Sequence, residues 1–579
     1  MKALAFPFLI LSFQAAILVT GCTARADIPV TVPLKEYENS ILDSGGKLIE
    51  EQAALDVHYY DLDLTVDPED SSLSGIVHTH ALIVGRTNVF VAHLDTVFTV
   101  SRVIQNGTGG GAGDKNEAVL DFYHEDGLIV ADLGRTFHPG DYLKVSVTYS
   151  GRPRMAPNPP WEGGFTWART ESGLPWIGVS CQVNGADIWW PVKDHPSDRA
   201  DSVSIRITVP EEVTAVSNGV LRSVAAERQP GTRTFHWVTN APISNYAVSI
   251  NIAPYEEIVR EYESVSGDVF PIIFWALPEN RGKAEILMDQ VVDHMRFFEE
   301  LLGPYPYRHE KYGVAEAPFF GMEHQTIIAY GAGYVDDTVF DTGSGFDDLH
   351  HHELSHEWWG NFVTAADWKD FWIHEGFGTY MQPLYAEYLH GKEQYRYFMK
   401  RIHERIMNNM PIAPEESRST REMFEGRDIY MKGAWVLHTL RKMIGDDHFF
   451  STLRQMTYPG GYQTASSEAA VTVVPARLTD TDEYIAIAER ISGKELDWFF
   501  DAYLRYSELP VLHQVMREGG VVLSWTVPSG REFPMPVEIW DGNERRTVVP
   551  DGSTVIPVSD PEKLRIDPDN KVLRAGMFH

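Results

Sequence analysis

The sequence predicts a multidomain α+β protein with an N-terminal antiparallel β domain, a mainly helical middle domain and a small C-terminal β-sandwich. The chain has 579 residues, more than one hydrophobic core usually serves. Apolar and polar residues alternate up to about residue 254, follow a helical period from about residue 279 to residue 506, and alternate again after that. Hydrophobic residues make up 43% of the chain, which favours packed domains over long disordered tracts.

The first residues, MKALAFPFLILSFQAAILVTGC, resemble a bacterial lipoprotein signal. Lys2 is followed by an apolar stretch over residues 3–19, and the tetrad VTGC resembles a lipobox. The pattern implies a signal peptide over residues 1–21 and a lipid on Cys22, the lipidation site. An uncleaved membrane anchor is the alternative, which Pro7 and the short apolar span disfavour.

The residues around Cys22 also indicate a location. Thr23 follows the cysteine, which resembles the pattern for outer-membrane sorting in Gram-negative bacteria. We therefore expect an exported, lipid-anchored protein that faces the periplasm, joined to its anchor by a polar tether over residues 22–46. The only other cysteine is Cys181, so a lipid on Cys22 leaves no structural disulfide. Cys181 is a buried small hydrophobe or, alternatively, a reactive thiol.

The charge of the chain excludes one class of partner. Asp and Glu number 82 against 49 Lys and Arg, which gives a formal net charge of -33. Such a charge repels phosphate backbones, so we expect no nucleic-acid partner. A well-solvated acidic surface is the simplest interpretation.

Residues 47–254 are expected to form the N-terminal domain. Segments of alternating apolar and polar residues are separated by turn residues, which is typical of strands with one buried face. The segments are VHYYDLDLTVD, GIVHTHALIV, YLKVSVTYSG, VSIRITVP and YAVSINIAP. Together they predict an antiparallel β domain.

Residues 255–506 and 507–579 are expected to form the other two domains. The segment AEILMDQVVDHMRFFEELLG predicts a helix that stops at Gly303. Its apolar positions, on or near one stripe, are Ile286, Val291, Met295 and Phe298. After residue 506 the alternation returns in VVLSWTVP, MPVEIW, RRTVVPDGSTVIPV and KLRIDP, which predicts the small β-sandwich.

The segment HHHELSHEWWG contains a metal-binding pattern. His352 and His356 are four positions apart, so they lie on one face of a helix and can share a cation. His350 and His351 cannot join them from that face. Glu353 then lies beside the metal ion, as the HExxH pattern requires.

A catalytic zinc site also needs a third protein ligand and an open position for water. Glu375 lies 19 positions after His356, in the segment WIHEGFGTYMQPLYAEYLHG, which predicts a helix ended by Gly391. We expect the HExxH helix to cover about residues 347–363, so that the two helices pack side by side. A bare HExxH also occurs by chance on polar helix surfaces, but the added glutamate within WxDxWxxEGF favours a metal site.

HELSHEWWGN through WIHEGF resembles the zinc aminopeptidase family that includes aminopeptidase N and the leukotriene hydrolases, the gluzincin metallopeptidases. This resemblance covers essentially the whole mature chain and implies a thermolysin-like zinc peptidase domain over residues 255–506. It implies that His352, His356 and Glu375 bind one zinc ion per chain and that Glu353 is the general base. Bound zinc lowers the pKa of its water to about 7, and a nearby carboxylate takes the proton.

The segment GMEH resembles the family's GxMEN strand, in which a glutamate binds the free α-amine of the substrate. The resemblance implies that Glu323 binds this amine and that Gly321, Met322 and His324 line the same subsite. An ordinary strand-edge acid is the alternative for Glu323. Phe320 and His324 depart from the family's glycine and asparagine, and His324 either contacts substrate or makes a structural hydrogen bond.

Two further segments resemble the family. CQVNGADIWWPVKDHPSDRAD resembles a glutamine followed by FPCxDxPxxKA, which implies that Gln182 lines the amine subsite. GRDIYMKGAWVLHTLRKMIG resembles the YxKG segment, which implies that Tyr430 stabilises the transition state. The apolar stripe of that helix comprises Val436, Leu440 and Met443. Gln382 stands where many relatives carry an acid, so the support of the zinc ligands is expected to differ.

Together these motifs predict a zinc aminopeptidase that hydrolyses N-terminal residues from peptides with a free N-terminus by metal-activated water. The alternatives are a zinc endopeptidase or an epoxide hydrolase on the same scaffold, or a non-catalytic, zinc-stabilised peptide-binding lipoprotein. GMEH argues against the endopeptidase, and the joint presence of Glu353 and Tyr430 argues against the binding protein. Family members commonly continue into an all-helical C-terminal domain that this chain lacks, so we expect a more open site or one covered by a second protomer.

Overall fold

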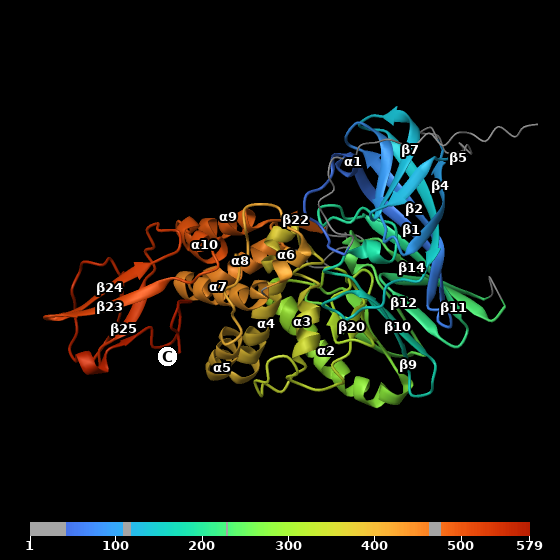
Figure 1. Cartoon of the computed structure of the whole chain (residues 1–579). Helices are drawn as coiled ribbons and strands as arrows, with labels where there is room; N and C mark the ends of the chain where they lie inside the picture. The colour runs from blue at the N-terminus through green and yellow to red at the C-terminus, as the bar shows by residue number, and fades with distance from the viewer. Residues whose placement is uncertain (1–41, 108–116, 227–229, 426, 462–475, 579) are drawn as a thin grey trace, which may run out of the picture.

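The computed structural model shows three parts in a row, with the helical part in the middle (Figure 1). The described residues are 42–107, 117–226, 230–425, 427–461 and 476–578. The predicted signal peptide, Cys22 and most of the predicted tether lie outside them. Within them, no helix has the length and apolar character needed to cross a membrane.

The N-terminal part is rich in β-strands. Its strands are β1 (Leu55–Asp67), β2 (Ser72–Ile83), β3 (Thr87–His93), β4 (Phe98–Asn106), β5 (Glu117–Val119), β6 (Phe122–Glu125), β7 (Leu128–Phe137), β8 (Tyr142–Gly151), β9 (Gly164–Arg169), β10 (Pro175–Ser180), β11 (Ser202–Pro210), β12 (Thr214–Ser217), β13 (Val220–Ala226), β14 (Thr232–Thr239) and β15 (Ile250–Ala253), preceded by a short helix α1 (Glu50–Ala53). In the described residues they form an eight-stranded sheet, β13-β14-β11-β1-β2-β8-β4-β5, and two smaller sheets, β3-β7-β6 and β12-β15-β10-β9. The alternation in the sequence reflects strands that bury every second side chain, as β1 does at Leu62, Leu64 and Val66.

Two details of this part differ from the sequence prediction. Strand β1 pairs in parallel with β11, with Tyr59 opposite Ser202, although the other pairs of the large sheet are antiparallel. A parallel pair requires a long connection, and residues 68–201 provide one. The segment YAVSINIAP forms a strand only in its second half, because Asn245–Ala247 make a 3-10 turn, η2.

The central part combines a five-stranded sheet with most of the helices. Its strands are β16 (Glu256–Glu263), β17 (Val269–Ala276), β18 (Tyr312–Glu316), β19 (Gly321–Met322) and β20 (Ile328–Tyr330), with the separate pair β21 (Val363–Ala365) and β22 (Arg477–Thr479). Its helices are α2 (Arg281–Leu302), α3 (Asp348–Ser355), α4 (Trp372–His390), α5 (Lys392–His403), α6 (Thr420–Phe424), α7 (Asp428–Ile444), α8 (Asp446–Thr457), α9 (Thr481–Ser492) and α10 (Asp497–Leu504). The sheet order is β16-β17-β18-β20-β19, so the short strand that carries the GMEH segment lies at one edge.

Helix α2 ends before Gly303, as the sequence predicts, and Gly303 adopts a φ of 112° that favours glycine. Three of the four expected apolar positions are buried, namely Val291, Met295 and Phe298. The fourth, Ile286, is instead 72% exposed. The buried face passes through Leu287 and Met288 at this turn, so the expected stripe was misplaced by one position there.

The helix of the HExxH motif is shorter than the sequence predicts. Helix α3 ends at Ser355, and His356 is its C-cap residue. Asp347 caps its N-terminus by accepting a hydrogen bond of 2.8 Å from the backbone N–H of His350. The residues that follow His356 make turns, yet their side chains are buried, as Trp359 shows. Burial in turns therefore produced the apolar pattern that suggested a longer helix.

The C-terminal part contains two small sheets. Its strands are β23 (Val511–Arg517), β24 (Gly520–Thr526), β25 (Val537–Trp540), β26 (Arg545–Val548), β27 (Ile556–Pro557) and β28 (Arg565–Ile566). The sheet orders are β23-β24-β27 and β26-β25-β28, and a small core of their own lies around Val521 and Ile539. The end of the chain is attached to the central part, because Tyr503 donates a hydrogen bond of 2.6 Å to the carbonyl of Leu573.

Candidate active site

Two helices of the central part bring three metal-binding side chains together. His352 and His356 come from α3 and its C-cap, and Glu375 comes from the first turn of α4. The Nε2 atoms of the two histidines are 3.1 Å apart. Glu375 Oε2 lies 3.5 Å from Nε2 of His352 and 3.4 Å from Nε2 of His356.

These spacings fit a tetrahedral zinc ion. Ligand atoms about 2.0 to 2.1 Å from such an ion lie about 3.3 Å from one another. The three observed separations are close to that value. In the described part of the chain Glu375 Oε2 is buried without a hydrogen-bond partner, which a bound cation would supply. His352, His356 and Glu375 can therefore hold a metal ion.

Neighbouring groups orient these side chains. Nδ1 of His356 lies 2.9 Å from the carbonyl of Trp359, so it carries the proton and leaves Nε2 for an ion. Gln182, from the loop after β10, donates a hydrogen bond of 3.2 Å to Oε1 of Glu375. The side chain of Gln382 lies beside His352 and donates to the carbonyl of Asp348 at 2.8 Å.

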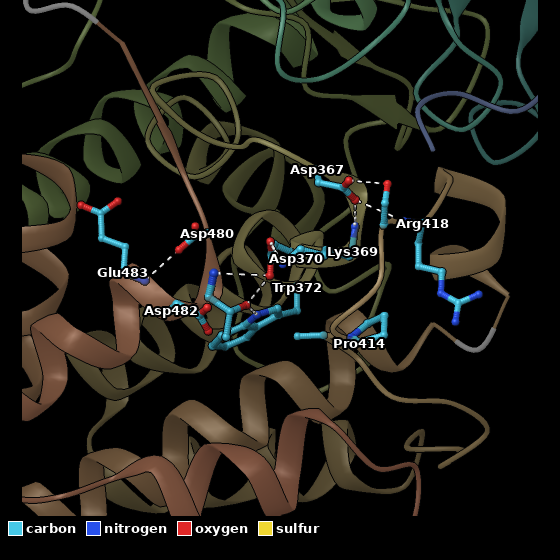
Figure 2. A network of polar contacts seen from close by, with 12 residues as sticks. Asp367, Lys369, Asp370, Trp372, Pro414, Arg418, Asp480, Asp482 and Glu483 are labelled. Carbon is cyan, nitrogen blue, oxygen red and sulfur yellow. Dashed lines mark hydrogen bonds and ion pairs between the residues drawn. The ribbon is translucent and has the colours of Figure 1, made fainter. Parts of the chain in front are cut away.

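The N-terminal end of α4 is fixed by a polar network around Asp370 (Figure 2). Asp370 ends a 3-10 helix, η4 (Trp368–Asp370), and accepts a hydrogen bond of 2.6 Å from the hydroxyl of Thr481, the first residue of α9. The indole N–H of Trp372 donates to the same hydroxyl at 2.8 Å. Trp372 begins α4 and Glu375 lies in the same turn, so these contacts determine where the metal-binding carboxylate is placed.

Tyr430 reaches the metal ligands from α7. Its ring stacks against that of His352, with 6.0 Å between the ring centroids. Burial, and after it the carboxylate of Glu375, raises the pKa of the Tyr430 hydroxyl well above its usual value. The hydroxyl therefore stays protonated and can donate a hydrogen bond to an oxyanion. The expected stripe of its helix is buried at Val436 and Leu440 and partly buried at Met443.

Glu353 lies next to the metal ligands and to the GMEH strand. Ligand atoms of Glu323, Glu353 and His356 all lie within 4.8 Å of one another. A Cβ at Gly321 would lie 2.8 Å from Oε1 of Glu353 and 2.9 Å from Cδ1 of Leu349, so a larger residue there would force these two side chains of α3 to shift. Burial, and then the carboxylate of Glu323, raises the pKa of Glu353 well above its usual value.

Glu323 is a buried carboxylate beside this group. Burial raises its pKa to about 7 against the lowering effect of His356, and the carboxylate of Glu375 adds to the rise. Gln182 donates a hydrogen bond to Oε1 of Glu323 as well as to Glu375. The amide of Gln182 thus connects the predicted amine site to the metal site.

Two residues that the sequence prediction missed hold the GMEH segment in place. Asn361 donates a hydrogen bond of 2.9 Å from Nδ2 to the carbonyl of Glu323. Glu357 accepts one of 2.7 Å at Oε1 from the backbone N–H of Thr326. Both follow the HExxH motif directly, as the E and N of HEWWGN, but nothing in the sequence shows which loop they contact. They connect the metal-binding segment rigidly to the predicted amine site.

His324 differs from the expectation that it lines the amine subsite. It is buried and does not line the cavity, although Gly321, Met322 and Glu323 do. Neither of its ring nitrogens has a hydrogen-bond partner among the described residues, and burial lowers its pKa to about 3.

The remaining histidines of the HHH run and Cys181 lie away from the metal site. His350 lies within 2.9 Å of both His294 and the hydroxyl of Tyr312. His351 packs against the ring of Tyr385, with centroids 4.7 Å apart. Cys181 is buried, which raises the pKa of its thiol well above the usual value. All three side chains are buried, and none of them lines the cavity at the metal site.

A cavity of about 520 Å³ opens over the metal ligands. It is lined by Glu323, Glu353, Tyr430 and the three metal-binding residues, and by Gln182 from the N-terminal part. Trp161 stacks on Phe320 in its wall, with ring centroids 6.0 Å apart. Two arginines that the sequence prediction did not single out, Arg405 and Arg427, also line it. A cavity of this size accommodates a few peptide residues.

Two segments of the chain match domains of a known protein family. Residues 57–247 match the peptidase M1 N-terminal domain, and residues 286–501 match the peptidase family M1 domain. The first match covers most of the N-terminal part, and the second contains every metal-binding residue named above. Together they cover most of the chain between residues 57 and 501.

The sequence identity to individual relatives is low. The chain is 26% identical to human endoplasmic reticulum aminopeptidase 1 over 321 residues, which cover 52% of this chain and 33% of the relative. It is 25% identical to aminopeptidase N of Haemonchus contortus over 332 residues, which cover 54% of this chain and 33% of the relative. The matched region thus spans about a third of the length of these relatives.

The fold is shared with a solved structure. The M1 zinc metallopeptidase from Deinococcus radiodurans superposes with a TM-score of 0.61 at 24% sequence identity, covering 81% of this chain and 98% of that chain. A mutant of that protein bound to a Tyr-Ser-Ala substrate superposes with a TM-score of 0.63 at 23% identity. The arrangement of a β-rich N-terminal part and a helical part is therefore that of a known fold.

Proposed function

Because the chain belongs to peptidase family M1, we propose that it is a zinc-dependent aminopeptidase that removes N-terminal residues from peptides. The observation that carries this proposal is the position of Glu323. Its buried carboxylate lies within 4.8 Å of Glu353 and His356, so a bound ammonium group there places the first peptide bond at the metal site. The names of the relatives, which include several aminopeptidases, agree with this proposal.

Each residue of the site has a defined task in this proposal. His352, His356 and Glu375 would hold the zinc ion, which when bound would supply a Lewis acid and lower the pKa of water to about 7. Glu353 takes the proton from the attacking water and passes it to the leaving amine. Tyr430 donates its hydroxyl proton in a hydrogen bond to the oxyanion that develops on the carbonyl.

The amine site defines where the peptide is cut. Glu323 pairs with the terminal ammonium group in a buried, charge-assisted contact. Gln182 contacts both Glu323 and Glu375, which leaves a polar wall at this end of the cavity. A chain that continued past the amine would have to displace these side chains, so one residue is removed at a time.

The decisive experiment is hydrolysis of a panel of aminoacyl-coumarins by the purified protein, with and without a chelator. We expect release of coumarin, its loss when the metal is removed, and its return when zinc is added. N-acetylated versions of the same substrates should resist cleavage, because they carry no ammonium group. Full activity in metal-free protein, or equal cleavage of acetylated and free substrates, would refute the proposal.

We also propose that the protein is exported and anchored by a lipid on Cys22 to the outer membrane, facing the periplasm. The support is the apolar segment that ends in VTGC at the N-terminus. Labelling of growing bacterial cells with a palmitate analogue should mark the wild-type protein, and Cys22→Ser should abolish the label. A labelled Cys22→Ser variant would show that the anchor lies elsewhere.

A further inference from the structure

Arg405, just after α5, lines the active-site cavity without an anionic partner. Within the described residues its guanidinium forms no hydrogen bond or ion pair. It lies over the ring of Phe340, 4.6 Å from the centroid. The neighbouring Arg401, for comparison, pairs with Glu404 at 2.9 Å.

The acidic residues near Arg405 form no ion pair with it, and two of them bind other groups. Asp348 accepts hydrogen bonds of 2.9 and 3.0 Å from the backbone N–H groups of residues 339 and 340. Glu404 pairs with the arginine one turn earlier in the helix. Asp341 contributes to the electrostatic field at Arg405 but lies beyond ion-pair distance. The guanidinium donors of Arg405 are therefore available to a ligand.

The segment that carries Arg405 is held rigidly against the catalytic helix. The backbone N–H groups of Met407 and Asn409 donate hydrogen bonds of 2.8 and 3.2 Å to the carboxylate of Asp428. Asp428 begins α7, which carries Tyr430 two residues later. The backbone next to Arg405 is thus fixed before any ligand arrives, which lowers the entropy lost on binding.

The metal ligands separate Arg405 from the amine site. His356 faces Glu323, because their ligand atoms lie within 4.8 Å of each other. His352 lies on the other side, beside Gln382. Arg405 lies over the ring of Phe340, and the backbone N–H of Phe340 donates a hydrogen bond of 3.0 Å to the carboxylate of Asp348, the first residue of α3. Arg405 therefore lies near the N-terminal end of α3 and Glu323 near its C-terminal end, with the two metal-binding histidines between them.

We propose that Arg405 binds a carboxylate on the part of the substrate that leaves. This inference rests on the proposed aminopeptidase function, since an amine held at Glu323 directs the released part toward Arg405. The carboxylate is either the free C-terminus of a dipeptide or tripeptide, or the acidic side chain of the residue after the scissile bond. The forked donors of a guanidinium match a carboxylate in both cases, and a cavity of about 520 Å³ suits short peptides.

The test compares matched peptides on the full, zinc-loaded chain. The first arm uses X-Ala and X-Ala-Ala with a free or an amidated C-terminus, where X is the best residue of the coumarin panel. The second arm uses amidated X-Glu-Ala and X-Gln-Ala, which separates an acidic side chain from a C-terminus. We expect kcat/KM to favour the carboxylate about tenfold in one arm, because a hydrogen bond to a charged group has about that effect.

Variants show whether Arg405 causes the preference. Arg405→Gln should bring the ratio of kcat/KM values close to one, and Arg405→Lys should retain part of it. The ratio is measured within one preparation, so partial misfolding cancels. Arg427→Gln is the matched control, because Arg427 lines the same cavity but lies over Trp161, at 5.4 Å, on the side of Phe320 and the amine site. It should keep the preference.

The outcomes separate this inference from the function on which it rests. Wild-type protein that releases amino acids from all peptides but shows a ratio near one in both arms would overturn the role of Arg405 alone. An unchanged ratio in Arg405→Gln, or an equal loss in Arg427→Gln, would do the same. Release of no amino acid from any peptide by zinc-loaded protein would overturn the aminopeptidase function as well.

Discussion

Gly433 of α7 packs directly against the backbone of Gly376 of α4. A Cβ added at Gly433 would lie 2.9 Å from the Cα of Gly376, closer than real Cβ atoms approach a backbone. Glu375 precedes Gly376, and Tyr430 lies one helical turn before Gly433. This contact therefore determines the separation between a metal-binding carboxylate and the hydroxyl proposed to stabilise the oxyanion.

Gly433→Ala should push α4 and α7 apart. Overpacking of this kind costs about 1 to 3 kcal/mol, which exceeds the gain of about 1 kcal/mol from the better helix propensity of alanine. We expect a lower free energy of unfolding in urea and a lower kcat, because Tyr430 moves relative to the metal ligands. Urea denaturation and coumarin release measure the two effects.

Gly282→Ala is the matched control for this substitution. Gly282 lies in α2, and a Cβ added there meets nothing within 4 Å. Alanine should leave the free energy of unfolding unchanged or raise it by at most about 1 kcal/mol, with kcat unchanged. If the two variants behave alike, the close approach of α4 and α7 has no energetic importance.

Glu353→Gln should abolish hydrolysis without removing the metal. The metal-binding residues are His352, His356 and Glu375, and an amide preserves the shape of the side chain. General base catalysis contributes about 100- to 10,000-fold, so kcat should fall by that factor. Zinc content by atomic absorption should remain at one ion per chain. Retained activity would show that another group takes the proton.

Glu323→Gln should remove the preference for a free amine. Losing one partner of a buried charge pair costs about 2 to 5 kcal/mol in the complex, so kcat/KM for unblocked substrates should fall accordingly. The difference between free and N-acetylated peptides should shrink at the same time, since acetylated substrates never used this contact. A variant that still discriminates fully would assign the amine to another group, with Gln182 the nearest candidate.

Local patterns in the sequence predicted the helix and strand types well where a single face is buried. Strand β8 covers the whole of YLKVSVTYSG, and α4 ends at His390, directly before Gly391, as expected. The predictions of helices and strands were wrong where side chains are buried on all sides of a segment. Turns after His356 carry apolar residues that imitate a helix, and the parallel pairing of β1 with β11 depends on a connection of more than a hundred residues.

The candidate site was predictable to the extent that it depends on spacing within motifs. The four-residue spacing of His352 and His356 places both on one face, and Glu375 completes the cluster. Contacts between distant segments were not predictable. Asn361 reaches the carbonyl of Glu323, and Arg405 reaches the cavity from the end of α5, through tertiary packing that leaves no periodic signal.

Thr481→Val should weaken the network that fixes the start of α4. The hydroxyl of Thr481 donates to Asp370 at 2.6 Å and accepts from the indole of Trp372 at 2.8 Å, and all three residues are buried. Valine has nearly the same shape but leaves the indole N–H unpaired, which costs about 1 to 3 kcal/mol. Zinc affinity should fall as well, because Glu375 lies in the turn that these contacts hold. Thr481→Ser keeps the hydroxyl. It should retain most of the free energy of unfolding, measured by urea denaturation, and most of the zinc affinity, measured by zinc titration. No loss in Thr481→Val would show that the hydroxyl has no such role, and a loss in Thr481→Ser as large as that in Thr481→Val would show that the methyl group matters as much as the hydroxyl.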